Sequence, residues 1–163
     1  MNKKRLHLLQ DIPIFGGVSA QTLEFIIARA TYITLEKGQF LFREGEPGET
    51  MFVLEEGSVA ILKAWRGKDY LLGKLGTGDC VGEMSLFDLN PRSASVAALS
   101  HCEAIVISHN LFYELHKQDI YQYALIQLNI SREVCRRLRD ADQQLFRAKL
   151  EADLINGEYV FHI

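Results

Sequence analysis

The chain has 163 residues, 48% of them hydrophobic and 24% charged, which is the composition of one ordinary folded domain with a buried core. Its net charge of -3 argues against a protein whose main task is to grip nucleic acid, because such domains usually carry a basic excess. Cys80, Cys102 and Cys135 are widely spaced and no histidine cluster accompanies them, so we expect no metal site and reduced thiols in the cytoplasm.

The N-terminal segment predicts neither a signal peptide nor a membrane span. Few apolar residues follow its basic start, and polar positions and Pro13 soon interrupt them. In the turn that follows, we expect the large side chains of Ile14 and Phe15 to pack on the core. From Ser19 to about Ala30 apolar residues recur at helical spacing behind a suitable N-cap, which predicts a short amphipathic helix.

Between Tyr32 and Ser108 the pattern changes to short apolar runs separated by glycines. The strand candidates are Phe40–Phe42, Met51–Leu54, Val59–Trp65, Tyr70–Leu75, Ala94–Leu99 and Ala104–Ile107. Short strands joined by tight turns at this density indicate a small antiparallel barrel or sandwich. The interval from Val81 to Asn90 interrupts these strands.

The stretch from Gly82 to Ala97 has the residues of a pocket for a phosphate and a sugar. Glycine lets the backbone approach a ligand closely, and a short helix opening near Glu83 aims free N–H groups inward. Arg92 supplies a planar, permanently charged fork, and Glu83 is suited to accept from a ribose hydroxyl. The alternative is that Arg92 is a surface residue paired with Glu83 or Asp88.

After Asn110 the periodicity is helical again as far as about Ile155. Steps of three and four residues form a heptad seam, made of Ser131, Val134, Leu138, Ala141, Leu145, Ala148, Ala152 and Ile155. The other positions are largely charged, so we expect this narrow stripe to join two copies in a homodimer. The alternative is that the seam packs back on its own barrel. The apolar character of the tail Tyr159–Ile163 suggests that this segment docks on the barrel.

Together these features resemble the cyclic nucleotide-binding domain of bacterial catabolite activator proteins, kinase regulatory subunits and nucleotide-gated channels. The first glycine-rich signature of that family matches Gly38, Phe40, Leu41, Phe42, Glu44, Gly45, Met51, Phe52, Val53, Leu54 and Gly57. The second, the phosphate-binding cassette (here Gly76–Val96), matches Gly76, Gly78, Asp79, Gly82, Glu83, Ser85, Leu86, Pro91, Arg92, Ala94 and Val96. The resemblance covers about Ile14 to Leu150.

The resemblance implies one α+β, mainly β domain over residues 1–163. We expect an eight-stranded antiparallel β-roll, a jelly-roll-like barrel, within about residues 14–108, with short N-terminal helices and a short phosphate-binding helix. C-terminal helices follow over about residues 110–155, including the long one that serves as lid and dimer contact.

The resemblance also assigns roles in a binding site. Arg92 pairs with the cyclic phosphate, Glu83 accepts from the ribose 2′-hydroxyl, Gly82 and Ser85 offer backbone N–H groups, and the Ser93 hydroxyl reaches a phosphate oxygen. The expected ligand-binding residues are Val81, Gly82, Glu83, Met84, Ser85, Arg92, Ser93 and Asp142. Glu44 and Gly45 are expected to be architectural, as a turn glycine and an acid that holds a local backbone group or an arginine.

The sequence leaves the choice of base open. A hydroxyl at Ser93 occurs in domains that bind cyclic AMP, and it can also contact guanine N2. Asp140 and Asp142 lie on the final helix where activators of this family have hydroxyl residues, and a carboxylate there can accept from adenine or guanine. The alternative is that both are solvated helix charges. We favour cyclic AMP and keep cyclic GMP as the second ligand; no other cofactor and no metal are expected.

For the output, we expect a stand-alone receptor rather than an enzyme, since no nucleophile elbow or poised acid pair occurs. Only Asn156–Ile163 follow the long helix, so direct DNA binding through a helix-turn-helix is not expected. The expected partners are a cyclic nucleotide, a second copy and an unidentified protein, with no membrane. Two alternatives stay open: a nucleotide-free interaction module, and the sensor fragment of a transcription regulator.

Overall fold

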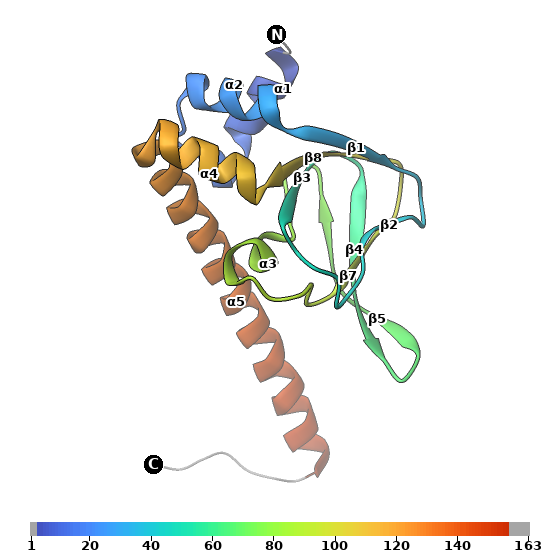
Figure 1. Cartoon of the computed structure of the whole chain (residues 1–163). Helices are drawn as coiled ribbons and strands as arrows, with labels where there is room; N and C mark the ends of the chain where they lie inside the picture. The colour runs from blue at the N-terminus through green and yellow to red at the C-terminus, as the bar shows by residue number, and fades with distance from the viewer. Residues whose placement is uncertain (1–2, 157–163) are drawn as a thin grey trace, which may run out of the picture.

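A computed structural model of the chain describes the backbone of residues 3–156 and the side chains of residues 5–152. The tail Tyr159–Ile163 and the side chain of Ile155 lie outside them. In chain order the elements are α1 (Lys3–Asp11), the 3-10 helix η1 (Pro13–Phe15), α2 (Ala20–Arg29), β1 (Thr31–Leu35), β2 (Phe40–Phe42), β3 (Thr50–Glu56), β4 (Ser58–Trp65), β5 (Lys68–Gly76), β6 (Cys80–Val81), α3 (Glu83–Asp88), β7 (Ser95–Ala98), β8 (Cys102–Ser108), α4 (His109–Gln118) and α5 (Ile120–Asn156). Figure 1 shows the strands as a roll with α1, α2 and α4 at one end and α5 along its side.

The described strands form two four-stranded sheets, ordered β1-β8-β3-β6 and β2-β7-β4-β5, with antiparallel neighbours throughout. The two sheets do not close on each other, so the predicted β-roll is confirmed as an open jelly-roll-like fold rather than a closed barrel. Strands β1 and β6 were not among the predicted strands. Strand β1 is largely exposed and therefore rich in polar positions, and β6 has only two residues.

Strand β3 explains why the segment Met51–Leu54 is a continuous apolar run. Met51 and Val53 pack with the helices, whereas Phe52 and Leu54 point to the opposite face and pack between the two sheets. On the neighbouring strand β8, Ile105 joins the first of these clusters. Both faces of this sheet are therefore covered, one by helices and one by the second sheet.

Two N-terminal predictions are confirmed, the packing of Ile14 and Phe15 and the helix that begins after Ser19. Ile14 and Phe15 are 2% and 1% exposed and belong to the core that the helices cover. The helix expected from Ser19 is α2, and the Ser19 hydroxyl accepts a hydrogen bond from the backbone N–H of Thr22 at 3.2 Å. Across residues 3–156, no helix combines the length and the apolar character that crossing a bilayer requires.

The C-terminal helical span is divided at Asp119 into α4 and α5. Asp119 ends α4 in an extended conformation, with φ at -151° and ψ at 94°. Its carboxylate then accepts hydrogen bonds from the backbone N–H groups of Tyr121 and Gln122, both at 3.1 Å. An aspartate that satisfies the free N–H groups of a new helix allows the chain to change direction without glycine or proline.

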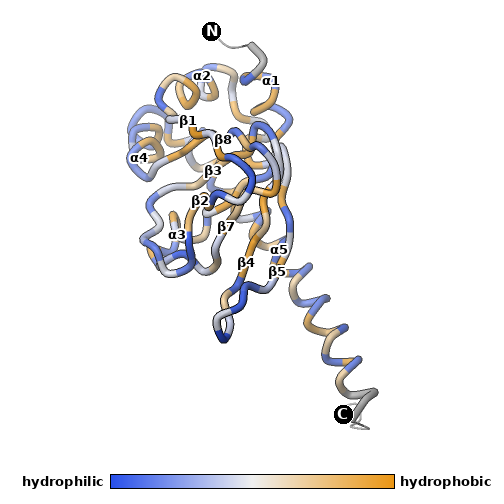
Figure 2. The backbone as a smooth tube through the Cα atoms, turned by 90° about the vertical axis from the view of Figure 1, so that its right-hand side faces the viewer, coloured by the Kyte–Doolittle hydropathy of each residue, from blue (hydrophilic) through white to orange (hydrophobic). Residues whose placement is uncertain are grey.

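The two halves of α5 have different surroundings. In the first half Ile126 is fully buried, and the amide of Asn129 donates to the carbonyl oxygens of Ile14 and Gly16. In the second half the side chain of Leu145 is 68% exposed. Figure 2 shows this second half projecting beyond the roll. The first half of α5 is therefore held by the core, and the second half is free to meet another molecule.

Candidate functional site

The cassette leaves the sheet at β6, turns at Gly82 into α3 and returns towards β7. Gly82 is left-handed, with φ at 83°, a conformation that glycine adopts without a steric penalty. A Cβ atom there would lie 2.5 Å from Nη1 of Arg92. This backbone path brings the first turn of α3, with the N–H groups that no helical carbonyl satisfies, next to the arginine.

Arg92 is 4% exposed and is held in one orientation. Its Nη1 donates to the carbonyl oxygen of Gly82 at 2.9 Å, and its Nη2 donates to Oγ1 of Thr50 at 3.0 Å. The guanidinium carbon lies 4.2 Å from the centre of the Phe42 ring. Bonds to neutral groups and contact with an aromatic face fix the fork without neutralising its charge.

The charge of Arg92 has no counter-ion among the described residues. Among residues 5–152, no carboxylate forms an ion pair with it, and its Nε–H has no hydrogen-bond acceptor. The alternative of a surface pair with Glu83 or Asp88 is therefore not observed. Burial lowers the pKa of Arg92, but a guanidinium stays protonated in proteins. A buried cation without a partner is costly, which suits a site that binds an anion.

Glu83 is tied to α5 through Arg137. Glu83 is 3% exposed, and its Oε1 accepts from Nη1 of Arg137 at 2.9 Å. Arg137 also donates to the carboxylate of Glu133 at 2.9 Å and to the carbonyl oxygen of Cys80 at 2.7 Å. Burial raises the pKa of Glu83, and Arg137 opposes that rise. In the sequence Arg137 is one of the charged positions off the heptad seam, and nothing local marks an ion pair whose members are 54 residues apart.

Replacing Arg137 by methionine should make the stability of the fold depend on pH. The change leaves Glu83 buried without its ionic partner, and breaking such a pair costs about 3 kcal/mol while the ion stays charged. Burial already raises the pKa of Glu83 in the folded state, and loss of Arg137 raises it further. The folded state then binds the proton more tightly than the unfolded chain, so stability is lost as the pH rises through the folded pKa.

We therefore expect Arg137→Met to lose about 3 kcal/mol of unfolding free energy at pH 8 and clearly less at pH 5. Urea titrations at the two pH values measure both losses against the wild type. The matched control is Arg139→Met, which removes an exposed arginine from the same helix and should change neither value. Equal losses of Arg137→Met at both pH values would contradict the assignment.

The first glycine-rich signature holds the backbone of Arg92. The N–H of Gly45 donates to the carbonyl oxygen of Arg92 at 2.9 Å, and the N–H of Arg92 donates to the carbonyl oxygen of Glu46 at 2.8 Å. The carboxylate of Glu44 accepts from the ammonium of Lys63 and from a backbone N–H of β4. Glu44 and Gly45 thus position the cassette, and the side-chain partner of the acid is a lysine rather than an arginine.

A cavity of about 100 Å³ lies between these groups. Its walls include predicted residues of the cassette: Val81, Gly82, Glu83, Met84, Ser85, Arg92 and Ser93. The remaining walls are Phe42, Ile61, Ala94, Val96 and Arg137, none of which was among the expected ligand-binding residues, although Ala94 and Val96 match the cassette and Phe42 the first signature. Asp142, the other predicted ligand residue, is exposed on α5 and is not part of the lining.

No cysteine or histidine among the described residues is part of the lining of this cavity. Residues 5–152 contain no group of three His, Cys, Asp or Glu side chains placed to hold a metal ion. Burial raises the pKa of the Cys80 thiol to about 12, so this thiol stays protonated. On the surface, the His101 ring pairs with Glu36 at 2.9 Å.

The comparison with protein families identifies this arrangement. The model of the cyclic nucleotide-binding domain family matches residues 32–119, more than half of the chain, and spans the whole cassette. The chain belongs to this family. The match includes Glu83 and Arg92 but ends before Arg137, so the contact from α5 lies outside the matched region.

Two curated relatives of this cyclic nucleotide-binding domain carry names that state a ligand. The Cyclic AMP receptor protein of Thermus thermophilus is 29% identical over 151 residues, covering 92% of this chain and 65% of that protein. The cAMP-activated global transcriptional regulator of Salmonella typhimurium is 32% identical over 126 residues, covering 76% of this chain and 58% of that protein. The chain therefore spans less than two thirds of the length of these relatives.

Solved structures show the same architecture. The catabolite activator protein of Thermus thermophilus matches with a TM-score of 0.74 at 26% identity, covering 85% of this chain and 64% of that one. A cyclic nucleotide-binding domain from Methylobacillus flagellatus matches with a TM-score of 0.80, covering 90% of this chain and 83% of that one. Its identity of 22% makes this second match a statement about the fold alone.

Proposed function

We propose that this cyclic nucleotide-binding domain is a receptor for cyclic AMP that acts by binding and not by catalysis. The observation that carries the proposal is the buried Arg92 guanidinium, which has no counter-ion among the described residues and faces the same cavity as Glu83. A cyclic phosphate supplies the missing anion, and the adjoining ribose supplies a hydroxyl for the carboxylate. Relatives named as a cyclic AMP receptor and as a cAMP-dependent protein kinase regulatory subunit support the choice of ligand.

Each side chain has a role that fits its chemistry. Arg92 pairs with the phosphate through charge-assisted hydrogen bonds, helped by backbone N–H groups from Gly82 to Ser85 and by the hydroxyl of Ser93. Glu83 accepts from the ribose 2′-hydroxyl, so the site distinguishes a ribonucleotide from its deoxy analogue. Val81 and Met84 complete the wall beside these polar groups.

The choice of adenine over guanine rests on fewer contacts than the assignment of the phosphate and ribose. The carboxylate of Asp140 accepts from Arg136 at 3.0 Å on the exposed side of α5, which supports the interpretation of Asp140 as a solvated helix charge. Asp142 is exposed as well, and it meets a base only if α5 shifts towards the cavity. Ser93 suits either base, so the names of the relatives carry the preference for cyclic AMP.

Titration calorimetry of the full chain with cyclic AMP, 2′-deoxy cyclic AMP and cyclic GMP tests the proposal. We expect one site per chain, with cyclic AMP bound at least about tenfold more tightly than either analogue, a difference of about 1.4 kcal/mol. Tighter binding of cyclic GMP would change the assigned ligand, but the proposal of a nucleotide receptor would stand. If none of the nucleotides gives a heat of binding, the proposal of a receptor is wrong and a nucleotide-free interaction module is favoured.

Binding is proposed to act on α5 through Arg137. The cavity of about 100 Å³ is smaller than the sites that hold small ligands, which enclose about 300–1,000 Å³. A nucleotide therefore requires one wall to move. Arg137 is the wall residue on α5, and its partner Glu83 is the group that the ribose engages. Competition for Glu83 shifts α5 between two positions, and the ligand selects one of them.

We further infer that the seam on α5 joins two copies of the chain. Val134 packs partly on the core, whereas Leu138 and Leu145 are 59% and 68% exposed. The alternative, in which the seam packs back on its own roll, is not seen for these two leucines. Two helices that pair along such a stripe bury the leucines of both.

Charged residues in the seam should separate the copies. We expect the double variant Leu138→Glu and Leu145→Glu to raise the dimer dissociation constant at least about 100-fold, because each buried leucine contributes about 1.5–3 kcal/mol. Size-exclusion chromatography with light scattering gives the mass. Gln143→Glu places one glutamate on the outward side of α5 and should leave the dimer intact. A monomeric wild type, or an unchanged mass of the double variant, would contradict the inference.

The proposed receptor acts in the cytoplasm and through protein contacts. Cys80, Cys102 and Cys135 are unpaired, as expected in a reducing compartment. The net charge of -3 gives no general affinity for nucleic acid, so we propose an unidentified protein as the partner rather than direct contact with DNA.

A further inference from the structure

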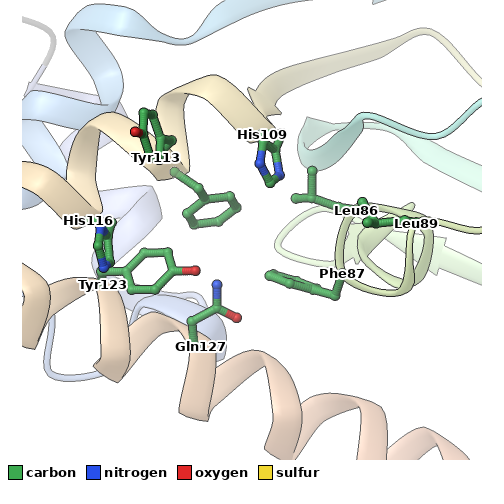
Figure 3. A pocket seen from close by; sticks show the side chains of 9 residues that line it. Leu86, Phe87, Leu89, His109, Tyr113, His116, Tyr123 and Gln127 are labelled. Carbon is green, nitrogen blue, oxygen red and sulfur yellow. The ribbon is translucent and has the colours of Figure 1, made fainter.

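A second cavity, larger than the one at the cassette, lies between α3, α4 and α5 and encloses about 350 Å³. Figure 3 shows side chains from three helices arranged around one central space. Leu86, Phe87 and Leu89 come from α3 and its end, His109 and Tyr113 from α4, and Tyr123 from α5. The volume falls within the range of about 300–1,000 Å³ that small-molecule sites occupy.

Aromatic rings form the inner wall of this cavity, here called the α3–α5 pocket. Phe112 is 3% exposed, and its ring centre lies 6.0 Å from that of Phe87 and 6.3 Å from that of Tyr123. The ring of His116 packs edge-on against Tyr123 at 5.1 Å. Aromatic rings pair favourably in offset and edge-to-face arrangements, so this wall offers several positions for a further flat ring.

The polar side chains of the lining, among them His109, Tyr123 and Gln127, have no hydrogen-bond partner among the described residues. In Figure 3 the Tyr123 hydroxyl and the Gln127 carboxamide point into the space from the α5 side, and the His109 ring lies across from them. None of these three side chains makes a hydrogen bond within residues 5–152. The lining contains no Asp, Glu, Lys or Arg. The pocket therefore offers donors and acceptors but no permanent charge to balance an ionic ligand.

The mouth of the pocket carries apolar surface that the fold leaves uncovered. Leu89 is 80% exposed and holds a left-handed backbone with φ at 58°, which is unfavourable for a leucine. Phe87 and Tyr113, beside it in the lining, are 39% and 54% exposed. A molecule seated in the pocket would remove this surface from water, which is favourable in proportion to the apolar area that it covers.

We propose that the α3–α5 pocket binds an uncharged, flat aromatic molecule of one or two fused rings that carries a hydrogen-bonding group. The rings stack within the aromatic wall, and the polar group meets Tyr123 and Gln127. This site is distinct from the cassette cavity, where Glu83, Arg92 and Arg137 supply charges that suit a nucleotide. The proposal does not depend on which nucleotide the cassette binds.

Methyl NMR of the full chain, titrated with 2-naphthol and with its charged counterpart 2-naphthoate, tests the proposal. We expect 2-naphthol to bind with a dissociation constant on the order of 0.1–1 mM and to shift the methyl signals of Leu86 and Leu89. The naphthoate should bind at least about fivefold more weakly, because no lysine or arginine among the described residues lines the pocket to pair with its carboxylate. Shifts confined to other parts of the protein, or equal binding of both probes, would overturn the proposal.

Two variants locate the contacts. Tyr123→Phe keeps the ring and removes the hydroxyl, so we expect binding about fivefold weaker. Leu89→Gly removes the leucine side chain at the mouth of the pocket. The variant should fold well because glycine suits the left-handed backbone. The matched control is Tyr121→Phe, which changes a tyrosine that is 85% exposed and outside the lining. Thermal melts check folding, and undiminished binding by both Tyr123→Phe and Leu89→Gly would refute the site.

Discussion

Replacing Arg92 by lysine should weaken the binding of cyclic AMP by about 100-fold or more while the domain stays folded. Lysine keeps the positive charge but loses the planar fork, and with it two charge-assisted hydrogen bonds worth about 1.5–3 kcal/mol each. The single ammonium also cannot hold the carbonyl oxygen of Gly82 and the hydroxyl of Thr50 as the two Nη groups do. The phosphate then meets a charge that is neither oriented nor fixed.

Calorimetry with cyclic AMP measures the loss, and circular dichroism melts confirm folding. Arg43→Lys is the matched control, because Arg43 also lies over an aromatic ring, 3.7 Å from the centre of Phe40, but is exposed and outside the cavity. It should keep the affinity of the wild type within about twofold. If Arg92→Lys binds as tightly as Arg43→Lys, the role of Arg92 in phosphate binding is wrong.

Replacing Gly82 by alanine should damage both the stability and the site. An L-residue in the left-handed region costs about 1–2 kcal/mol. The new Cβ would also lie 2.5 Å from Nη1 of Arg92 and 3.2 Å from the carbonyl oxygen of Thr50, so the guanidinium must leave its place. We expect a loss of about 3 kcal/mol of unfolding free energy in total and at least about tenfold weaker binding of cyclic AMP.

Gly78→Ala separates these two effects. Gly78 has φ at 90°, but a Cβ there would meet no atom within 4 Å. This variant therefore shows the backbone strain alone, about 1–2 kcal/mol in urea unfolding, and it should keep its affinity for cyclic AMP. Equal stability and equal affinity of Gly82→Ala and Gly78→Ala would show that close approach to Arg92 is not what requires glycine at position 82.

The parts of the fold that could be predicted are those whose signals are local. The apolar run of β3, the Ser19 cap of α2 and the helical periodicity of α5 each depend on residues close together in the chain. Strand β1 could not be found in this way, because it is mostly exposed and depends on its pairing with β8. More than one C-terminal helix was expected, but the break could not be placed at Asp119 because an aspartate inside a helical pattern is not a strong stop signal.

The candidate site divides in the same way. Gly82, Glu83 and Arg92 could be named together because one short segment carries them, and their chemistry suits one ligand. Arg137 could not be named, since its place depends on how α5 crosses the cassette. Asp142 was expected from its position on the same helix, and the structure leaves it in solvent, outside the lining.

The two glycine-rich signatures, over Gly38–Gly57 and Gly76–Val96, indicated by themselves the family of this protein, and the stretch from Gly82 to Ala97 supplied the residues of the proposed site. Only the tertiary structure decided that Arg92 is buried without a counter-ion among the described residues, that Glu83 is held by Arg137, and that an uncharged aromatic pocket lies beside α3. The physical reason is that spacing along the chain specifies backbone conformation and residue chemistry. Burial and ion pairing depend instead on neighbours that folding brings from distant segments.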